Sequence, residues 1–186
     1  MGRVSQTQAQ ENRERVVETA SRLFREQGTQ VSVADLMKAA GLTHGGFYKQ
    51  FPSKEALVDE ATAHAFDELA QRHAAGIERH AGQREAAQRE LIDAYLSVEH
   101  RDNAGDGCPV AGLAADMART SGNQQAHHLY AEGVRTFADA LATEDQDGIT
   151  RLCTMLGALV LARATKDSPL STEILTTARA ALTATD

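Results

Sequence analysis

The sequence contains few of the residues that build aromatic cores, disulfide frameworks or membrane spans. Among its 186 residues there is no Trp, only 4% are aromatic, three are Pro and two are Cys. The longest near-continuous apolar run, Met155 to Ala162, is far below the roughly 20 residues that a membrane span requires. No apolar signal segment follows Arg3. We therefore expect a cytoplasmic protein with reduced thiols and no membrane partner.

Signatures of catalysis and metal binding are missing as well. The sequence has no Gly-rich phosphate loop, no Gly-x-Ser-x-Gly turn and no paired-carboxylate motif. Its seven His residues lack ligand spacing; His127 and His128, for example, are adjacent and would point apart on a helix. These absences predict a protein that is not an enzyme and that binds no metal and no cofactor.

What the sequence does contain is helical periodicity along nearly its whole length. Hydrophobic residues make up 42% of the chain, and small aliphatic side chains favour closely packed helices. No segment alternates at strand period, so we predict an all-α protein of about nine helices. The expected helices cover about 11–27, 32–41, 44–50, 53–73, 84–99 and 109–119, then a segment from a Gly122–Asn123 turn to Leu141, then 149–164 and 171–184.

Charge divides the chain into two parts. Residues 1–54 carry 8 basic and 5 acidic side chains, whereas the remaining residues carry 11 basic and 21 acidic ones. A mildly basic head on an acidic body suits a protein that binds nucleic acid through one end only, although an acidic body is also common in the cytosol. We expect a head at 1–52 and a body at 53–186, joined by a continuous helix. The arginines at 13, 15, 22 and 25 are interpreted as mostly a solvated face.

The stretch from Ser32 to Glu55 is the most informative part of the sequence. Ser32 can cap a first short helix, and Gly41 stands where that helix must end. Thr43 can cap a second short helix, in which Phe47 and Phe51 are spaced to pack inward. The other side of this second helix would then face outward. Such a pair of helices is typical of a helix-turn-helix, although a plain helical hairpin has the same pattern.

The segment GLTHGGFYKQFPSKEAL resembles the DNA-binding signature of the TetR family of bacterial transcriptional regulators. The matching positions are Gly41, Leu42, Thr43, Gly46, Phe47, Tyr48, Phe51, Ser53, Lys54, Glu55 and Leu57. The resemblance covers about the first third of the chain. One departure is visible, because the link from Gly28 to Ser32 is a residue shorter than usual in the family.

The resemblance implies an N-terminal three-helix head with a helix-turn-helix that binds double-stranded operator DNA. In such a complex Thr43 could bond a phosphate, and Lys54 would meet another at a helix N-terminus. His44, Gly45 and Gly46 would face base edges, with Tyr48 and Lys49 against the groove wall. The full predicted set of DNA-binding residues is Ser32, Thr43, His44, Gly45, Gly46, Tyr48, Lys49 and Lys54.

The penultimate helix is apolar nearly all round, which predicts burial on every side. The resemblance implies that this helix and the last one pack against a second copy as a four-helix bundle, giving a homodimer. A helix buried inside a monomer is the alternative. The predicted dimer residues are Leu152, Met155, Leu156, Leu159, Ile174 and Ala178, and Cys153 in the same helix is interpreted as structural.

The resemblance also implies a pocket for a small-molecule effector within a C-terminal helical ligand-binding and dimerisation bundle. The candidate lining residues are Phe66, Tyr95, Cys108, Met117, Tyr130 and Phe137, each of which could instead be plain core. Cys108 directly precedes Pro109 at a helix start, where a thiol pKa can fall. The segment GCPVAGLAADMA resembles a stretch in family members that include electrophile and oxidant sensors. Asp106 would oppose such a thiolate.

We therefore expect a DNA-binding repressor that is released from its operator by a small-molecule effector. One alternative is a thiol-based electrophile or oxidant sensor that acts through Cys108. Others are a helical interaction module that does not bind DNA and a thiol enzyme built around the same cysteine.

Overall fold

The computed structural model describes residues 6–119 and 124–184, and within these ranges the chain forms ten helices and no strand. They are α1 (Gln6–Gln27), α2 (Val33–Ala39), η1 (His44–Lys49), α3 (Lys54–Arg79), α4 (Arg84–Tyr95), α5 (Val98–Asp102), α6 (Pro109–Arg119), α7 (Gln124–Leu141), α8 (Gly148–Ala164) and α9 (Pro169–Thr183). The all-α prediction is confirmed. Every helix in these ranges is too short or too polar to serve as a membrane span.

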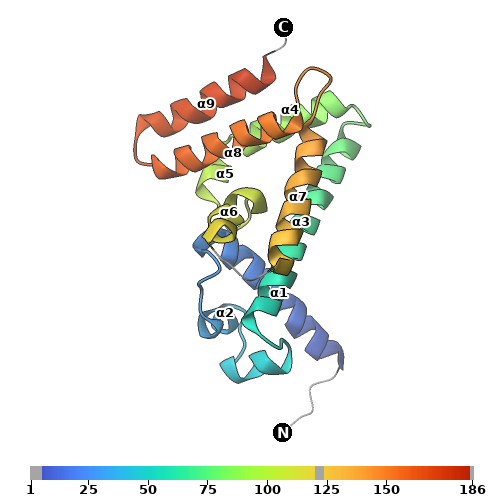
Figure 1. The fold of residues 1–186 in the computed structure, drawn as a ribbon, viewed down its shortest axis with the longest axis vertical. Coiled ribbons are helices and arrows are strands. Elements are labelled where there is room, and N and C mark those ends of the chain that lie inside the picture. Colours follow the sequence, from blue (N-terminus) through green and yellow to red (C-terminus); the bar gives the residue numbers. More distant parts are fainter. Residues whose placement is uncertain (1–5, 120–123, 185–186) are drawn as a thin grey trace.

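The helices form an elongated molecule whose two ends differ (Figure 1). In this view α2 and η1 lie at the end near the N-terminus, and α8 and α9 lie at the opposite end. α3 and α7 run side by side between them, and α8 packs against both α7 and α9. α1 contacts α2, α3 and α6. The long α3 therefore carries the chain from one end into the other without a flexible linker.

Two predicted boundaries were wrong. α3 continues through Gly76 to Arg79, and the chain turns only at Ala81 and Gly82, whose φ angles are 52° and 81°. The predicted helix over 84–99 is interrupted after Tyr95, because Ser97 starts a new helix by accepting a hydrogen bond from the His100 N–H at 3.1 Å. The predicted Gly122–Asn123 turn lies outside the described residues.

Two hydrophobic cores fill the molecule. The head core is built around Phe24, Leu36, Phe47 and Phe51, each at most 1% exposed, and it also contains Leu57 from α3 and Met117 from α6. The body core is built from α4, α7, α8 and α9 and includes Ile92, Phe137, Met155 and Leu159. The head core thus extends past residue 53 into α3 and α6, which ties the head to the body by packing.

Candidate functional site

The turn between α2 and η1 forms as its residues require. The Ser32 Oγ accepts a hydrogen bond from the Asp35 N–H at 3.1 Å, which caps α2. Gly41 has φ +72°, a conformation that glycine adopts without steric cost. The Leu42 N–H then donates to the Met37 carbonyl at 2.8 Å, which closes the helix end.

η1 is held to the head by its inward side chains. Phe47 is fully buried and Phe51 is 1% exposed, and their rings stack with centroids 5.5 Å apart. Gly46 lies close to α2, since a Cβ at this position would be 3.6 Å from the Met37 Cε. Sequence periodicity predicts an α-helix here, but the six residues form a 3-10 helix, which suits so short a segment.

The opposite side of η1 is open. Tyr48 is 67% exposed, His44 and Lys49 are exposed, and a Cβ at Gly45 would have no neighbour within 4 Å. Ser32 is exposed as well, whereas Gly46 and Lys54 are half-buried. The predicted DNA-binding residues thus lie on α2, η1, the turn between them and the start of α3, at one end of the molecule (Figure 1).

The predicted cap at Thr43 was wrong. Its backbone has the extended angles of a capping residue, but its side chain makes no capping hydrogen bond. Because Thr43 is exposed, its hydroxyl is free to bond another molecule. Ser53 does cap the next helix, where its Oγ accepts a hydrogen bond from the Ala56 N–H at 3.2 Å.

Arg25 fixes the head to the body, a role that the sequence did not reveal. It is 4% exposed, so its interpretation as part of a solvated face was wrong. Its guanidinium donates to the Gly107 carbonyl at 3.1 Å and to the Glu68 carboxylate at 3.0 Å. Burial lowers the pKa of Arg25 from its usual value, and Glu68 partly opposes this shift. Next to it on α1, Arg22 pairs with Asp106 at 2.8 Å.

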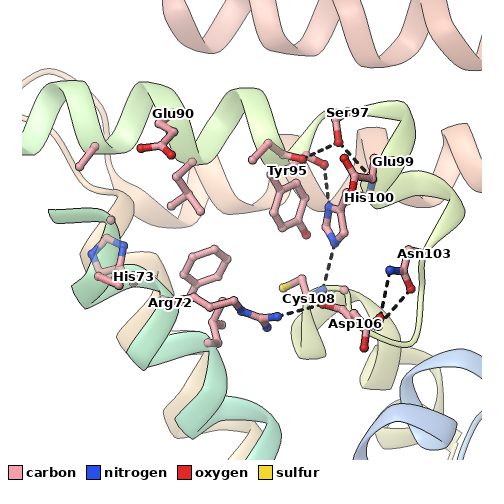
Figure 2. Close-up of a pocket in the computed structure, with 18 of the residues that line it drawn as sticks. Arg72, His73, Glu90, Tyr95, Ser97, Glu99, His100, Asn103, Asp106 and Cys108 are labelled. Carbon is pink, nitrogen blue, oxygen red and sulfur yellow. Dashed lines mark hydrogen bonds between the residues drawn. The ribbon is translucent and has the colours of Figure 1, made fainter. Parts of the chain in front are cut away.

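Both of these contacts reach the loop that closes one side of a cavity in the body. The cavity has a volume of about 660 Å³ and lies between α3, α4, α7 and the segment from Ser97 to Cys108 (Figure 2). Tyr95, Cys108 and Phe137 line it, as predicted candidates. Arg72 and His100, which also line it, were missed because nothing local marks them in the sequence.

The other three predicted pocket residues lie elsewhere, which corrects the prediction for this cavity. Phe66 packs against the Tyr130 ring at 5.9 Å between centroids. The Tyr130 hydroxyl donates to the Val110 carbonyl at 2.8 Å, so it is already satisfied. Met117 belongs to the head core. Helical periodicity identified these side chains as inward-facing but could not tell a packed face from a cavity wall.

His100 organises one end of the cavity. Its Nδ1 donates to the Tyr95 carbonyl at 2.7 Å, and its Nε2 accepts from the Cys108 N–H at 3.0 Å (Figure 2). Both ring nitrogens are therefore used by the neutral imidazole, and a second proton would break the bond to Cys108. Burial lowers the pKa of His100, which favours the same neutral form.

Cys108 does not have the activated thiol that a place at a helix start can produce. It is 4% exposed, and burial raises the pKa of its thiol although the N–H groups of Ala111 and Val110 oppose the shift. Cys153, interpreted as structural, is exposed in the single chain, and both cysteines are free thiols. The described residues contain no cluster of three or more His, Cys, Asp or Glu suited to a metal ion.

The predicted dimer residues fall into two groups. Leu152, Met155 and Leu159 are at most 3% exposed within their own chain, so they have no surface left for a partner and the prediction for them was wrong. Leu156, Ile174 and Ala178 are partly buried at the edge of the body core. α8 is not buried on every side: its exposed apolar face consists of Ile149, Cys153, Gly157, Val160 and Leu161, which recur at helical spacing.

Comparisons with known proteins agree with this architecture. Residues 16–61 match the model of bacterial regulatory proteins of the TetR family. The HTH-type transcriptional regulator AcrR of Shigella flexneri is 39% identical over 61 residues, which are 32% of this chain and only 28% of that protein. The similarity to this curated relative thus spans little more than a quarter of its length.

Solved structures match nearly the whole chain. The reduced form of Escherichia coli NemR has a TM-score of 0.76 at 20% identity, over 93% of this chain and 95% of that one. A TetR transcriptional regulator from Chloroflexus aurantiacus has a TM-score of 0.73 at 22% identity, over 95% and 94%. These identities are too low to show more than the shared fold. The match over residues 16–61 shows that the head belongs to the TetR family of bacterial regulatory proteins.

Proposed function

We propose that this protein is a cytoplasmic transcriptional regulator that binds operator DNA as a homodimer and releases it when a small molecule occupies the body cavity. The observation that carries this proposal is the exposed side of η1, which two buried phenylalanines hold outward at one end of the molecule. A six-residue helix with so little buried surface is best explained by a role for the side that it exposes.

The exposed side of η1 suits the major groove of double-stranded DNA. Gly45 leaves room for the backbone of η1 to approach base edges, since no side chain stands there. Lys49 and Lys54 supply positive charge on either side of Phe51. Thr43 and Ser32 place hydroxyls at or near helix starts, where phosphates bind. The geometry is that of a helix-turn-helix whose second helix enters the groove by its N-terminal residues.

The apolar face of α8 supports a homodimer. Ile149 and Val160 are each 47% exposed and Leu161 is 56% exposed, which would be costly in water if the face stayed open. With α9 beside it, this face suits a four-helix contact between two copies. The two heads of such a dimer would bind half-sites about 34–36 Å apart.

The loop between α5 and α6 connects the cavity to the head, so a bound effector could change the position of the head through it. Asp106 and Gly107 line the cavity and are bonded to Arg22 and Arg25 of α1. A ligand that moves this loop therefore acts on α1, which packs against α2 and α3 in the head. The resulting change in the distance between the two heads would favour a dimer that no longer fits its operator.

The proposal is tested by titrating labelled random double-stranded DNA with the protein at several salt concentrations. We expect the logarithm of the association constant to fall linearly with the logarithm of the salt concentration. The slope should be about −0.9 for each phosphate that the protein contacts. Lys54→Ala should weaken binding to all sequences and reduce the salt slope by about one unit, whereas His44→Ala should change sequence preference. Absence of binding at low salt would instead favour the interaction module.

The thiol sensor and the thiol enzyme have less support. Both require a reactive thiolate, whereas the Cys108 thiol is buried and its pKa is raised. Labelling of Cys108 with a thiol reagent at pH 7 should accordingly be slow in the folded protein and fast in urea. Rapid labelling of the folded protein at pH 7 would favour the thiol sensor, and turnover of a peroxide would favour the thiol enzyme.

A further inference from the structure

The body cavity has apolar walls in its middle and polar residues toward both ends, with His73, Arg79 and Glu90 lining the end away from α6. Leu69, Leu91 and Phe137 supply apolar walls from α3, α4 and α7. At the end nearest α6, Tyr95, His100, Arg72 and Cys108 come together, as Figure 2 shows. A cavity of this volume and composition is typical of a site for a drug-sized organic molecule.

The Tyr95 hydroxyl is unusual among the polar groups at this end. Tyr95 is 5% exposed, yet its hydroxyl makes no hydrogen bond of normal geometry within the described part of the chain, and it interacts instead with the Cys108 thiol, a weak hydrogen-bonding group. A buried hydroxyl with so weak a partner costs free energy, and a ligand with an acceptor oxygen would remove that cost. His100 cannot serve as that partner, because both of its ring nitrogens are already used.

The same end has positive charge that no carboxylate neutralises. Arg72 donates to the Asp106 carbonyl at 3.0 Å, and Arg163, which lies within electrostatic reach of Tyr95 and Cys108, donates to the carbonyls of Arg101 and His100. Across residues 6–119 and 124–184, neither guanidinium forms an ion pair with a carboxylate.

The acidic residues that line the cavity have partners of their own, with one exception. Asp106 is paired with Arg22, and Glu90 is paired with Arg79 and His80. Glu99 is the exception, and because its side chain is exposed, solvent screens its charge. The Tyr95 end of the cavity therefore favours an anion.

We propose that the effector is an amphipathic organic acid, whose apolar body lies between Leu69, Leu91 and Phe137 and whose carboxylate accepts hydrogen bonds from Tyr95 and Arg72. This inference rests on the proposed function, since it names the chemical class of the effector. A carboxylate that binds Arg72 competes with the Asp106 carbonyl for the same guanidinium. Ligand binding would thereby loosen the loop that Arg22 and Arg25 connect to the head.

The test is a calorimetric titration of the full-length protein, without DNA, with three probes that share one apolar body. They are biphenyl-4-carboxylate, its neutral amide and the cationic 4-phenylbenzylamine. We expect the carboxylate to bind tightest and the amine weakest. Arg72→Gln should weaken carboxylate binding about tenfold and change amide binding little, since an ionic hydrogen bond is lost only for the acid. Tyr95→Phe should weaken both by about fivefold, because both probes offer an acceptor oxygen.

Matched variants separate this specific effect from general damage. Arg79→Gln removes an arginine from the same cavity that is already paired with Glu90, so it should leave carboxylate affinity within about twofold. Arg72→Lys keeps the charge and should restore part of the loss. Equal binding of acid and amine, equal loss for all three probes in Arg72→Gln, or no binding of any probe would overturn the proposal. Because DNA is absent, such a failure leaves the DNA-binding proposal standing.

Discussion

The two cores of this molecule are packed for different purposes. In the head, Phe24, Phe47 and Phe51 are each at most 1% exposed. This tight packing keeps the other side of η1 exposed to solvent. In the body, the core surrounds a cavity of about 660 Å³, leaves the Tyr95 hydroxyl with only a weak partner in the Cys108 thiol and exposes an apolar face on α8. The head is complete within one chain, whereas the body has surfaces that a ligand and a second copy would fill.

The adjacent residues Phe47 and Tyr48 give the sharpest test of this contrast. Phe47→Ala should lower the free energy of unfolding by about 3–5 kcal/mol, because it empties a fully buried site in the head. Tyr48→Ala removes a side chain that is 67% exposed and should change stability by less than about 0.5 kcal/mol while weakening DNA binding. Urea unfolding measures both. Equal destabilisation by the two variants would contradict the outward placement of Tyr48.

Leu161→Glu tests the open face of the body. A charge in the middle of an apolar contact between two copies should shift the protein from dimer to monomer at micromolar concentration, with the helical content retained. Ala131→Glu places the same charge on the exposed side of α7 and should leave the dimer intact. Analytical ultracentrifugation gives the oligomeric state. A dimer that persists in Leu161→Glu would show that the interface lies on another surface.

Gly112→Ala tests the packing between head and body. A Cβ at Gly112 would lie 2.9 Å from the Arg25 Cα, which is backbone and cannot easily move. We expect a loss of about 1–3 kcal/mol in the free energy of unfolding, because α6 would be pushed away from α1. Gly45→Ala, where the new Cβ has no neighbour, is the control and should not destabilise the protein. An unchanged urea midpoint for Gly112→Ala would show that α6 and α1 can move apart at this contact at little cost in stability.

Acidification should destabilise the body slightly through two partly buried histidines. Burial lowers the pKa of His100 and of His73 below their ordinary value of 6.5. As pH falls through 6.5, the unfolded chain therefore takes up protons that the folded chain does not, and stability falls with pH below that value. Urea midpoints at pH 7.5 and 5.5 measure the effect, which should shrink in His100→Gln. A midpoint that rises on acidification would contradict it.

Local features of the head could be predicted from the sequence because their causes are local. Ser32, Gly41 and Ser53 act on residues within a few positions of themselves, and the structure has each in its expected role. Phe47 and Phe51 are buried as their spacing predicts. The features that the sequence missed depend on contacts across the chain. Arg25 is buried because Gly107, 82 positions away, accepts its hydrogen bond.

Periodicity also failed where it could not identify what a helix packs against. It correctly indicated inward positions for Met117 and Tyr130, but Met117 packs in the head core and Tyr130 bonds to the Val110 carbonyl, so neither lines the cavity. The apolar sequence of α8 hid the difference between Met155, which faces its own chain, and Leu161, which does not. Gly76 looked like a helix end, yet α3 continues through it because the preceding and following residues favour the helix.

The most direct test of the central claim is the DNA affinity of Gly45→Ala at low and moderate salt. This change adds one methyl group on the exposed side of η1, where the chain itself has nothing within 4 Å. If η1 enters the major groove, DNA affinity should fall about tenfold while the urea midpoint stays unchanged or rises slightly. Affinity equal to that of the unmodified protein, together with intact folding, would show that this side of η1 does not lie against DNA.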